Sequence, residues 1–395
     1  MSLNHKITYL FFSSADWDAP YWTNKQHTAK TIANYGHTVI FIESIGIRRP
    51  SFNSRDIKRM GSKLFNFFKI LILGPKFISS NLIIITPISI PFFRGLVITN
   101  KLNNFILKFI LKKTLKSLDI TDFIIWSYHP YLDHDDTFFN SKPIIYHCVD
   151  DVSVIPGVDS KTFKTMEETL INKSNIVFVT SKALLNKHKK INQKTFFYPN
   201  VIDENLICKK IKTNNNSELS KIYGKKIVYH GSLSTFKIDF KKLIKFFSEH
   251  HNLNLILIGD EPEGQKDKNL VNLLTLKNVY SLGYRKGKDI SSLLNMCDLG
   301  IIPLIRNRYT ESMYPMKLYE FLACGLRVVT LNVQNIDKIK YAYFEDNFIS
   351  FKNQILKQLN MPKIPSSYIS RILKSDNYKE RYIKMLNKIN KYILK

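Results

Sequence analysis

The sequence predicts an α/β protein of two domains, each built on a parallel sheet. Its 395 residues are enough for two domains of ordinary size. Short apolar runs alternate with helix-length segments in both halves, which is the pattern of parallel strands joined by helices. A stretch rich in Lys, Asn and Ser near residues 209–224 indicates a linker. We therefore expect a first domain over 1–203, a linker over 204–224, a second domain over 225–375 and a final helix over 376–395.

Composition bounds the possible partners and the compartment. Lys and Arg total 59 against 32 Asp and Glu, a net charge of +27. This excess favours nucleic acid or an anionic membrane as a partner, although an AT-rich genome would enrich Lys in the same way. The four cysteines form no Cys-x-x-Cys, which is typical of reduced thiols in a cytosolic protein. The N-terminus lacks a signal-peptide pattern, and the longest apolar run, Leu82 to Phe93, is too short to span a bilayer.

The first half opens with two strands, Lys6 to Phe12 and Thr38 to Glu43, separated by a loop and a helix. Trp17, Trp22 and Gln26 border the loop that follows the first strand. Ligands of open α/β sheets bind at that edge, so these three residues are candidates for contact with a substrate, on the side of an acceptor if the reaction is a transfer. The two Trp side chains could equally serve packing. No Gly-x-Gly-x-x-Gly appears, so a dinucleotide-binding interpretation loses its main support.

Two later strands present titratable groups at the same edge. Phe123 to Ser127 is followed by Tyr128-His129-Pro130, and Ile144 to Val149 is followed by Asp150-Asp151. Adjacent carboxylates repel each other, which raises the pKa of one of them toward a value useful to a general base. Asp150, Asp151 and His129 are therefore the candidate catalytic residues. The alternative is that these residues cap helices or form turns.

Basic and aromatic residues interleave over 52–75 and 92–118. Phe105 with Phe109 and Lys108 with Lys112 recur at helical spacing, which predicts an amphipathic basic helix. Such a helix suits docking on anionic lipid. The alternative is a helix that faces the core and exposes its lysines to water.

The second half alternates five apolar strands with helices: Lys226 to His230, Leu253 to Ile258, Asn278 to Leu282, Asp298 to Leu304 and Leu326 to Leu331. Gly231, Gly259 and Gly283 each lie just past one of these strands. A glycine there lets a phosphate or a base approach the backbone closely.

A polar loop and a helix separate the last two of these strands. Pro315 suits the helix start, and the helix should run from about Met316 to Cys324 and stop at Gly325. The helix dipole disfavours a cation in the first turn, so Lys317 makes sense there if an anion is bound. Glu320 shares its face. A phosphate on Lys317 and a sugar hydroxyl on Glu320 fit a nucleotide sugar, and a surface Lys–Glu pair is the alternative.

These residues carry a family resemblance. Tyr314-Pro-Met-Lys-Leu-Tyr-Glu-Phe-Leu-Ala-Cys-Gly, together with Tyr229-His-Gly-Ser, Leu257-Ile-Gly259 and Leu282-Gly-Tyr284, resembles the donor-binding half of GT-B glycosyltransferases. It is most similar to the branch typified by teichuronic-acid transferases and the xanthan glucuronosyltransferase. The resemblance implies two Rossmann-like domains with parallel sheets facing across a cleft, and a final helix that crosses back to the first. It implies donor contacts from Gly231, Ser232, Gly259, Gly283, Tyr284, Tyr314, Met316, Lys317, Leu318 and Glu320.

The resemblance also bears on mechanism. Retaining relatives carry Glu-x7-Glu; Glu320 matches the second Glu, but Ser312 stands eight residues earlier and Glu311 is one residue out of step. An aspartate of the first domain, by resemblance, is the base of an inverting reaction. No metal is required if Lys317 and the helix start neutralise the diphosphate. An Asp-x-Asp of the metal-binding type occurs at Asp16 and Asp18, but in the wrong domain.

The sequence thus predicts a bacterial glycosyltransferase of hexosyl or glycuronosyl type without cofactor. We expect it to move a sugar from a nucleotide-diphosphate donor, by resemblance a UDP-sugar, to a lipid-linked or growing surface polysaccharide such as a capsule or cell-wall glycan. We expect it in the cytoplasm, peripheral on the inner face of the cell membrane. The alternative is a non-enzymatic basic binder of nucleic acid or membrane with a degenerate GT-B fold. No nucleic-acid motif appears, and the basic residues are spread along the chain, so no nucleic-acid partner is expected.

Overall fold

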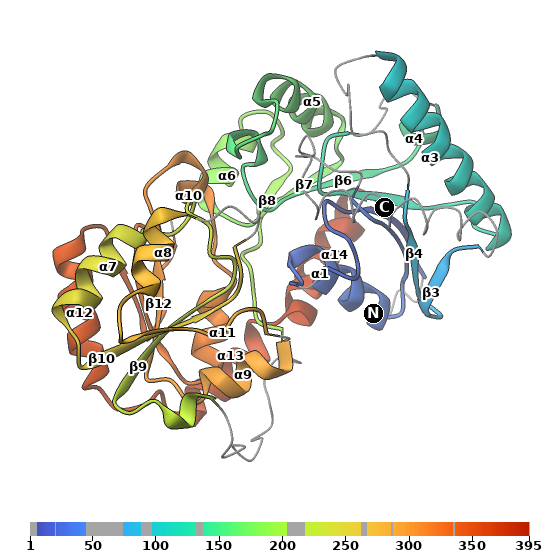
Figure 1. The fold of residues 1–395 in the computed structure, drawn as a ribbon. Coiled ribbons are helices and arrows are strands. Elements are labelled where there is room, and N and C mark those ends of the chain that lie inside the picture. Colours follow the sequence, from blue (N-terminus) through green and yellow to red (C-terminus); the bar gives the residue numbers. More distant parts are fainter. Residues whose placement is uncertain are drawn as a thin grey trace. The chain divides into compact units, whose positions relative to one another are not determined.

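The computed structural model describes residues 6–19, 21–44, 74–87, 97–131, 137–203, 218–261, 267–285, 287–334 and 336–394 (Figure 1). The chain forms two compact units, one of Met1–Tyr198 with Arg381–Lys395 and one of Pro199–Glu380. The first unit therefore ends slightly before residue 203 and takes in the C-terminal residues. Residues 52–73 and 92–96 of the basic stretches, and 204–217 of the expected linker, lie outside the described residues.

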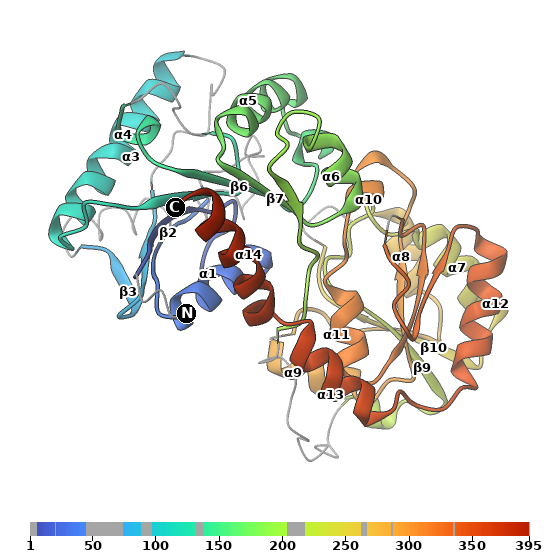
Figure 2. The same ribbon diagram turned by 180° about the vertical axis from the view of Figure 1, so that it is seen from behind.

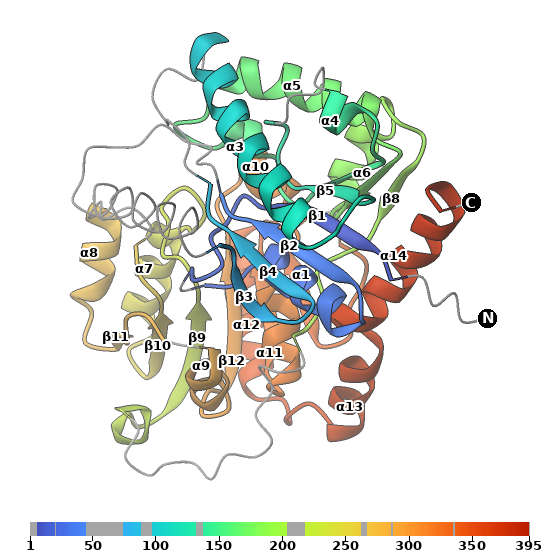
Figure 3. The same ribbon diagram turned by 90° about the vertical axis from the view of Figure 1, so that its right-hand side faces the viewer.

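The first unit contains an eight-stranded sheet in the order β3-β4-β2-β1-β5-β6-β7-β8. Its strands are β1 (Thr8–Phe12), β2 (Thr38–Ile42), β3 (Lys76–Ser79), β4 (Leu82–Ile85), β5 (Ile124–Ser127), β6 (Ile144–Cys148), β7 (Ile176–Val179) and β8 (Thr195–Phe197). Every neighbouring pair is parallel except the edge hairpin β3–β4, which Figure 3 shows in light blue. The central strands are apolar throughout because helices cover both faces of the sheet.

Alternation along these strands builds two cores. Leu10 and Phe12 point into a core shared with α3 (Val97–Ser117), α4 (Thr137–Asn140), α5 (Ser160–Lys173) and α6 (Lys182–His188). Tyr9 and Phe11 point to the other face, where α1 (Asn24–Asn34) and α14 (Tyr378–Tyr392) pack (Figure 2). The Tyr382 hydroxyl of α14 lies 3.1 Å from that of Tyr9. The last helix thus completes the core of the first unit.

The second unit contains a six-stranded sheet, β11-β10-β9-β12-β13-β14, in which all pairs are parallel. The strands are β9 (Lys225–His230), β10 (Leu253–Ile258), β11 (Val279–Ser281), β12 (Leu299–Pro303), β13 (Arg327–Leu331) and β14 (Ala342–Glu345). One face packs against α7 (Phe240–Glu249), α8 (Lys268–Leu274) and α12 (Phe348–Leu359). On the other face Phe321 of α11 (Lys317–Ala323) lies against Gly300 of β12. The unit also contains η3 (Glu218–Lys221), α9 (Gly287–Leu294), α10 (Arg308–Ser312) and α13 (Ser366–Ser375).

The structure adds elements that the sequence did not predict. Part of the longest apolar run forms β4, and the polar loop expected before Pro315 contains α10. A capping box starts α10: the Asn307 side chain accepts from the Thr310 N–H at 2.8 Å, and the Thr310 hydroxyl accepts from the Asn307 N–H at 3.0 Å. A helix this short does not produce a detectable periodic pattern of apolar residues in the sequence. None of the helices in the described ranges is long and apolar enough to cross a membrane.

Candidate active site

Helix α11 holds two charged side chains at the carboxyl edge of the second sheet. It runs from Lys317 to Ala323, with Cys324 as its C-cap, and Gly325 with φ +78° follows directly. Leu318, Phe321 and Leu322 bury the inner face of the helix. That anchoring fixes the direction of Lys317 and Glu320, which are only half-buried.

Lys317 lies over the glycine that ends β9. The positive φ of Gly231, +118°, already favours glycine, and a β-carbon there would collide with Lys317 Cε and Nζ. The ammonium also lies 5.6 Å from the centre of the Tyr229 ring, within the range of a cation–π contact. The structure therefore brings Lys317 and Gly231 together at the strand end, where the sequence predicted a diphosphate.

Glu320 reaches the same strand one residue earlier. Its Oε2 lies 2.8 Å from Nε2 of His230, whose ring packs edge-on against Phe321 at 5.1 Å. His230 belongs to the Tyr229-His-Gly-Ser motif but is not among the predicted site residues. Its position directly before Gly231, at the end of a strand, was the signal that could have found it.

The three predicted glycines are packed against one another. The Gly231 N–H donates to the Ile258 carbonyl at 2.8 Å, and the Gly259 N–H donates to the Gly283 carbonyl at 2.9 Å. A β-carbon on Gly259 would collide with the carbonyl of Gly231. The backbones therefore pack closely at the ends of β9, β10 and β11, where they form one continuous surface.

Other predicted donor residues have different surroundings. Tyr314 is buried; its hydroxyl lies 3.2 Å from that of Tyr319, and its carbonyl accepts from the Asn200 amide at 2.7 Å. The Leu318 side chain lies in the core, so only its backbone could meet a donor. Met316 and Tyr284 are half-buried, and the Ser232 carbonyl accepts from the Tyr229 hydroxyl at 3.1 Å.

The first carboxylate of Glu-x7-Glu has no structural substitute in α10. Ser312 is buried and donates to the Tyr309 carbonyl at 2.8 Å. Glu311 pairs instead with Arg306, at 3.3 Å from Nε. Both side chains are therefore engaged locally.

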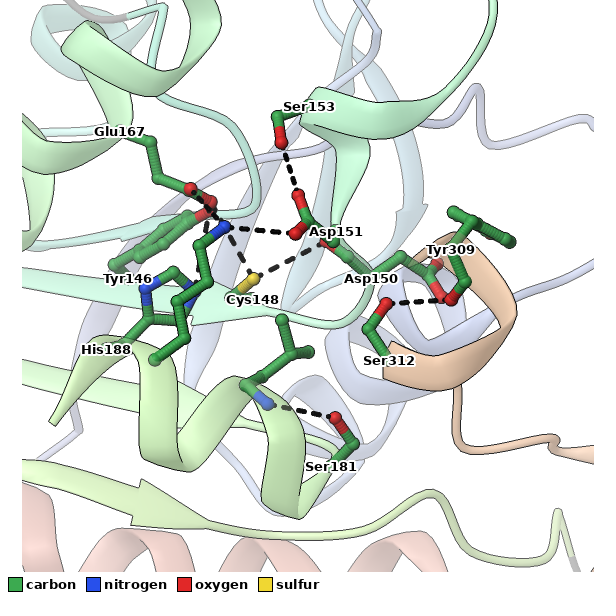
Figure 4. A network of polar contacts seen from close by, with 12 residues as sticks. Tyr146, Cys148, Asp150, Asp151, Ser153, Glu167, Ser181, His188, Tyr309 and Ser312 are labelled. Atoms are coloured by element: carbon green, nitrogen blue, oxygen red, sulfur yellow. Dashed lines mark hydrogen bonds and ion pairs between the residues drawn. The ribbon is translucent and has the colours of Figure 1, made fainter. Parts of the chain in front are cut away.

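In the first unit, Asp151 is held in a polar network at the end of β6 (Figure 4). Its carboxylate accepts from the Ser153 hydroxyl at 2.6 Å and from the Lys187 ammonium at 3.1 Å. Burial tends to raise the pKa of Asp151, but these two partners outweigh it and hold that pKa below its ordinary value. The paired carboxylates predict a raised pKa for one of the two. Asp151 is not that one, because the Lys187 ammonium and the Ser153 hydroxyl stabilise its ionised form.

Asp150 differs from its neighbour although both follow the same strand. It is half-buried, and its side chain points away from the Asp151 network in Figure 4. Its carbonyl accepts from the Val152 N–H at 3.0 Å, which starts the short helix η1 (Val152–Val154). Successive residues at a strand end face different sides, and here only Asp151 faces Lys187.

His129 is almost completely buried, with 1% of its surface exposed. Its Nδ1 accepts from the Tyr131 N–H at 3.3 Å, and its ring packs edge-on against Phe12. The Ser127 hydroxyl donates to the His129 carbonyl at 2.6 Å. These contacts give His129 a role in the turn that follows β5.

Two of the three candidates for the acceptor side make structural contacts. Gln26 is fully buried; its side chain accepts from the Thr23 N–H at 3.0 Å, capping α1, and donates to the Asp16 carbonyl at 2.9 Å. Trp17 is buried, and its ring centre lies 4.8 Å from that of Trp22. Trp22 is half-buried, so it keeps the more accessible ring.

Two α/β units, each with a mostly parallel sheet, are the architecture of the GT-B class of glycosyltransferase folds. Residues 211–385 match the family described as "Glycosyl transferases group 1". The second half of the chain is thus similar to glycosyltransferase group 1 domains, and the chain has the fold of a GT-B glycosyltransferase.

One curated relative is the putative teichuronic acid biosynthesis glycosyltransferase TuaH of Bacillus subtilis strain 168, 22% identical over 234 residues. The match covers 55% of this chain and spans 58% of the length of TuaH.

Solved structures confirm the fold. Sucrose-phosphate synthase of Thermosynechococcus elongatus is similar with a TM-score of 0.70 at 12% identity, covering 98% of this chain and 99% of that one. Anabaena HepE in complex with UDP has a TM-score of 0.65 at 15% identity, covering 98% and 100%. HepE with UDP-glucose has a TM-score of 0.60, also at 15% identity, covering 98% and 95%.

Proposed function

We propose that this chain transfers a sugar from a nucleotide-diphosphate sugar, with UDP as the nucleotide, and that the second unit binds the donor. The observation that carries the proposal is the placement of the Lys317 ammonium over Gly231 at the end of β9. A cation beside closely packed glycine backbone is suited to a diphosphate. Glu320, beside His230 at the same strand end, is suited to accept from sugar hydroxyls. The UDP and UDP-glucose complexes of HepE support this choice of ligand class.

The proposed base is Asp150. A general base must be accessible enough to meet the acceptor hydroxyl. Asp151 is committed to Ser153 and Lys187, and His129 is almost completely buried. Asp150 is half-buried and lies at the carboxyl edge of its sheet. A carboxylate base gives direct displacement by the acceptor hydroxyl and hence inversion at the sugar carbon.

The transfer is proposed to need no divalent metal or cofactor. Lys317 supplies a positive charge to the leaving diphosphate, the role that a divalent metal ion would otherwise fill. Turnover in the presence of a chelator should therefore match turnover with added magnesium. A rate restored only by magnesium or manganese would contradict this part of the proposal.

The proposed acceptor is a lipid-linked or growing surface polysaccharide at an anionic membrane. The name of TuaH places that relative in teichuronic acid biosynthesis. Helix α3 buries Leu107, Ile110, Leu111 and Leu115 in the core, yet its outer face exposes Phe105 and Phe109, 69% and 56%. Three exposed lysines, Lys112, Lys113 and Lys116, share that helix. Exposed rings among lysines suit the boundary between lipid headgroups and acyl chains.

The deciding experiment is an assay of the full chain against a panel of sugar nucleotides, with release of nucleoside diphosphate as the readout. We expect one uridine donor to give turnover that depends on an added lipid-linked acceptor. A thermal-shift screen provides an independent measure of nucleotide binding. No shift with any nucleotide, together with salt-sensitive binding of oligonucleotides, would favour the non-enzymatic binder instead.

A further inference from the structure

A buried cluster of three metal-ligand types lies beneath the helices of the first unit (Figure 4). Cys148 at the end of β6, Glu167 of α5 and His188 of α6 are each at least 98% buried. One ligand atom from each lies within 4.8 Å of the others. Cys148 Sγ is 3.8 Å and His188 Nε2 is 3.9 Å from the same oxygen, Glu167 Oε1.

The imidazole of His188 provides a second observation. Within the described part of the chain, neither of its ring nitrogens makes a hydrogen bond, although the side chain is fully buried. Leaving buried polar atoms without partners is costly.

The distances are close to those of a zinc site. Zinc–sulfur bonds of about 2.3 Å and zinc–oxygen or zinc–nitrogen bonds of about 2.1 Å place tetrahedral ligands roughly 3.4–3.6 Å apart. The sulfur–oxygen separation of 3.8 Å and the nitrogen–oxygen separation of 3.9 Å exceed this by a few tenths of an ångström, and all three ligand atoms lie within 4.8 Å of one another. Side-chain shifts on the order of 1 Å would close the site.

The surrounding charges also balance. Lys187 donates to Glu167 Oε2 at 3.3 Å and to Asp151, so it leaves Oε1 directed toward the sulfur and the imidazole. Tyr146 donates its hydroxyl to Oε1 at 2.7 Å and would have to turn away. A Cys148 thiolate, Glu167 and Asp151 would carry three negative charges against Zn²⁺ and the Lys187 ammonium, which sum to zero.

We propose that Cys148, Glu167 and His188 bind one Zn²⁺ that ties α5 and α6 to the end of β6. A water molecule completes the tetrahedron. The Cys148 thiol releases its proton to solvent as the zinc–sulfur bond forms. Because the ligands are buried, the ion stabilises the unit and does not contact substrate, so the inference goes beyond the proposed transfer reaction.

The test is titration of the chelator-treated full chain with Co²⁺, followed by displacement with Zn²⁺. We expect one equivalent of Co²⁺, with a near-ultraviolet thiolate-to-cobalt band and the visible bands of a tetrahedral ion. Zinc should abolish both and raise the melting temperature. Absence of the thiolate band from the folded chain would overturn the proposal, and so would a zinc content of zero after growth with added zinc.

Matched variants assign the ligands. Cys148→Ser should lose the thiolate-to-cobalt band. His188→Asn should lose the visible bands of the tetrahedral ion. Cys297→Ser, a buried thiol of the second unit, and His147→Asn should keep both. His147 is a fair control because it is also fully buried and without a hydrogen-bond partner among the described residues, but it stacks on Tyr128 across the sheet. Retention of the band in Cys148→Ser would contradict the assignment. If the ligand variants fail to fold, the titration of the unaltered chain decides alone.

Discussion

Lys317 occupies the space that a side chain at Gly231 would need. The two residues come from α11 and from the end of β9, so their contact ties the position of the cation to the absence of a β-carbon. Any substitution at Gly231 must therefore move the ammonium that we assign to the donor diphosphate.

Gly231→Ala should weaken nucleotide binding by roughly 10- to 150-fold, the equivalent of one charge-assisted hydrogen bond of about 1.5–3 kcal/mol. Lys317→Ala should lower both donor affinity and turnover without unfolding the protein. The double variant should be less than additive, because both changes remove the same contact. Calorimetric titration with UDP measures all three. Gly157→Ala is the control, since Gly157 also has a positive φ, +82°, but open space around it. Additive losses of nucleotide affinity would show that Gly231 and Lys317 act independently.

His230→Ala should raise the donor dissociation constant severalfold while the fold is retained. The reason is the 2.8 Å contact between His230 and Glu320, which fixes the carboxylate that we assign to sugar hydroxyls. Glu320→Gln should show a similar loss, and the double variant should add little to it. His250→Ala, at the end of α7, is the matched control. Normal affinity in His230→Ala would mean that Glu320 needs no partner for its position.

Asp150→Asn should lower turnover by about two to four orders of magnitude, the usual contribution of a general base. Nucleotide binding should be unchanged, because the second unit binds the donor. Steady-state kinetics with saturating donor measures the effect, and His129→Ala serves as the comparison. An active Asp150→Asn with an inactive His129→Ala would make the histidine the base.

Asp151→Asn should destabilise the protein more than it slows the reaction. The folded state holds the pKa of Asp151 below its ordinary value, so its ionised form stabilises the fold. That contribution is complete above the unfolded pKa of about 3.9 and is lost as pH falls through the lower folded pKa. The difference in unfolding free energy between wild type and Asp151→Asn should therefore shrink below about pH 4. Urea unfolding across pH 3 to 7 tests this, and a constant difference would be the contrary result.

Phe105→Ser with Phe109→Ser should reduce flotation with anionic liposomes without changing the unfolding midpoint, because both rings face outward. High salt should reduce flotation of the unaltered protein as well. Phe77→Ser, on the edge strand β3 and 56% exposed, is the control for a ring lost elsewhere. Equal flotation with neutral liposomes would show that the attachment is not electrostatic.

Much of the fold follows from local sequence. The apolar runs that became β6, β12 and β13 are continuous because helices cover both faces of a parallel sheet, and such runs can be recognised without a structure. Ser181 is a typical N-cap residue, and at the start of α6 its side chain accepts from the Leu184 N–H at 3.2 Å. Polar residues after such strands necessarily share one edge, so the strand-end position of Lys317, Gly231 and Asp150 could be predicted.

Which of those edge residues meet was decided only by tertiary structure. Asp150 and Asp151 are equivalent in sequence. They differ in the structure because Lys187, 36 positions after Asp151 in the chain, donates to Asp151. His230 contacts a candidate donor-binding residue because the packing of α11 places Glu320 next to it. Cys148, Glu167 and His188 have no motif spacing and converge only when α5 and α6 pack on β6. Sequence patterns report the burial and backbone of one segment, whereas partners from different segments are chosen by packing, and that information is spread over the whole chain.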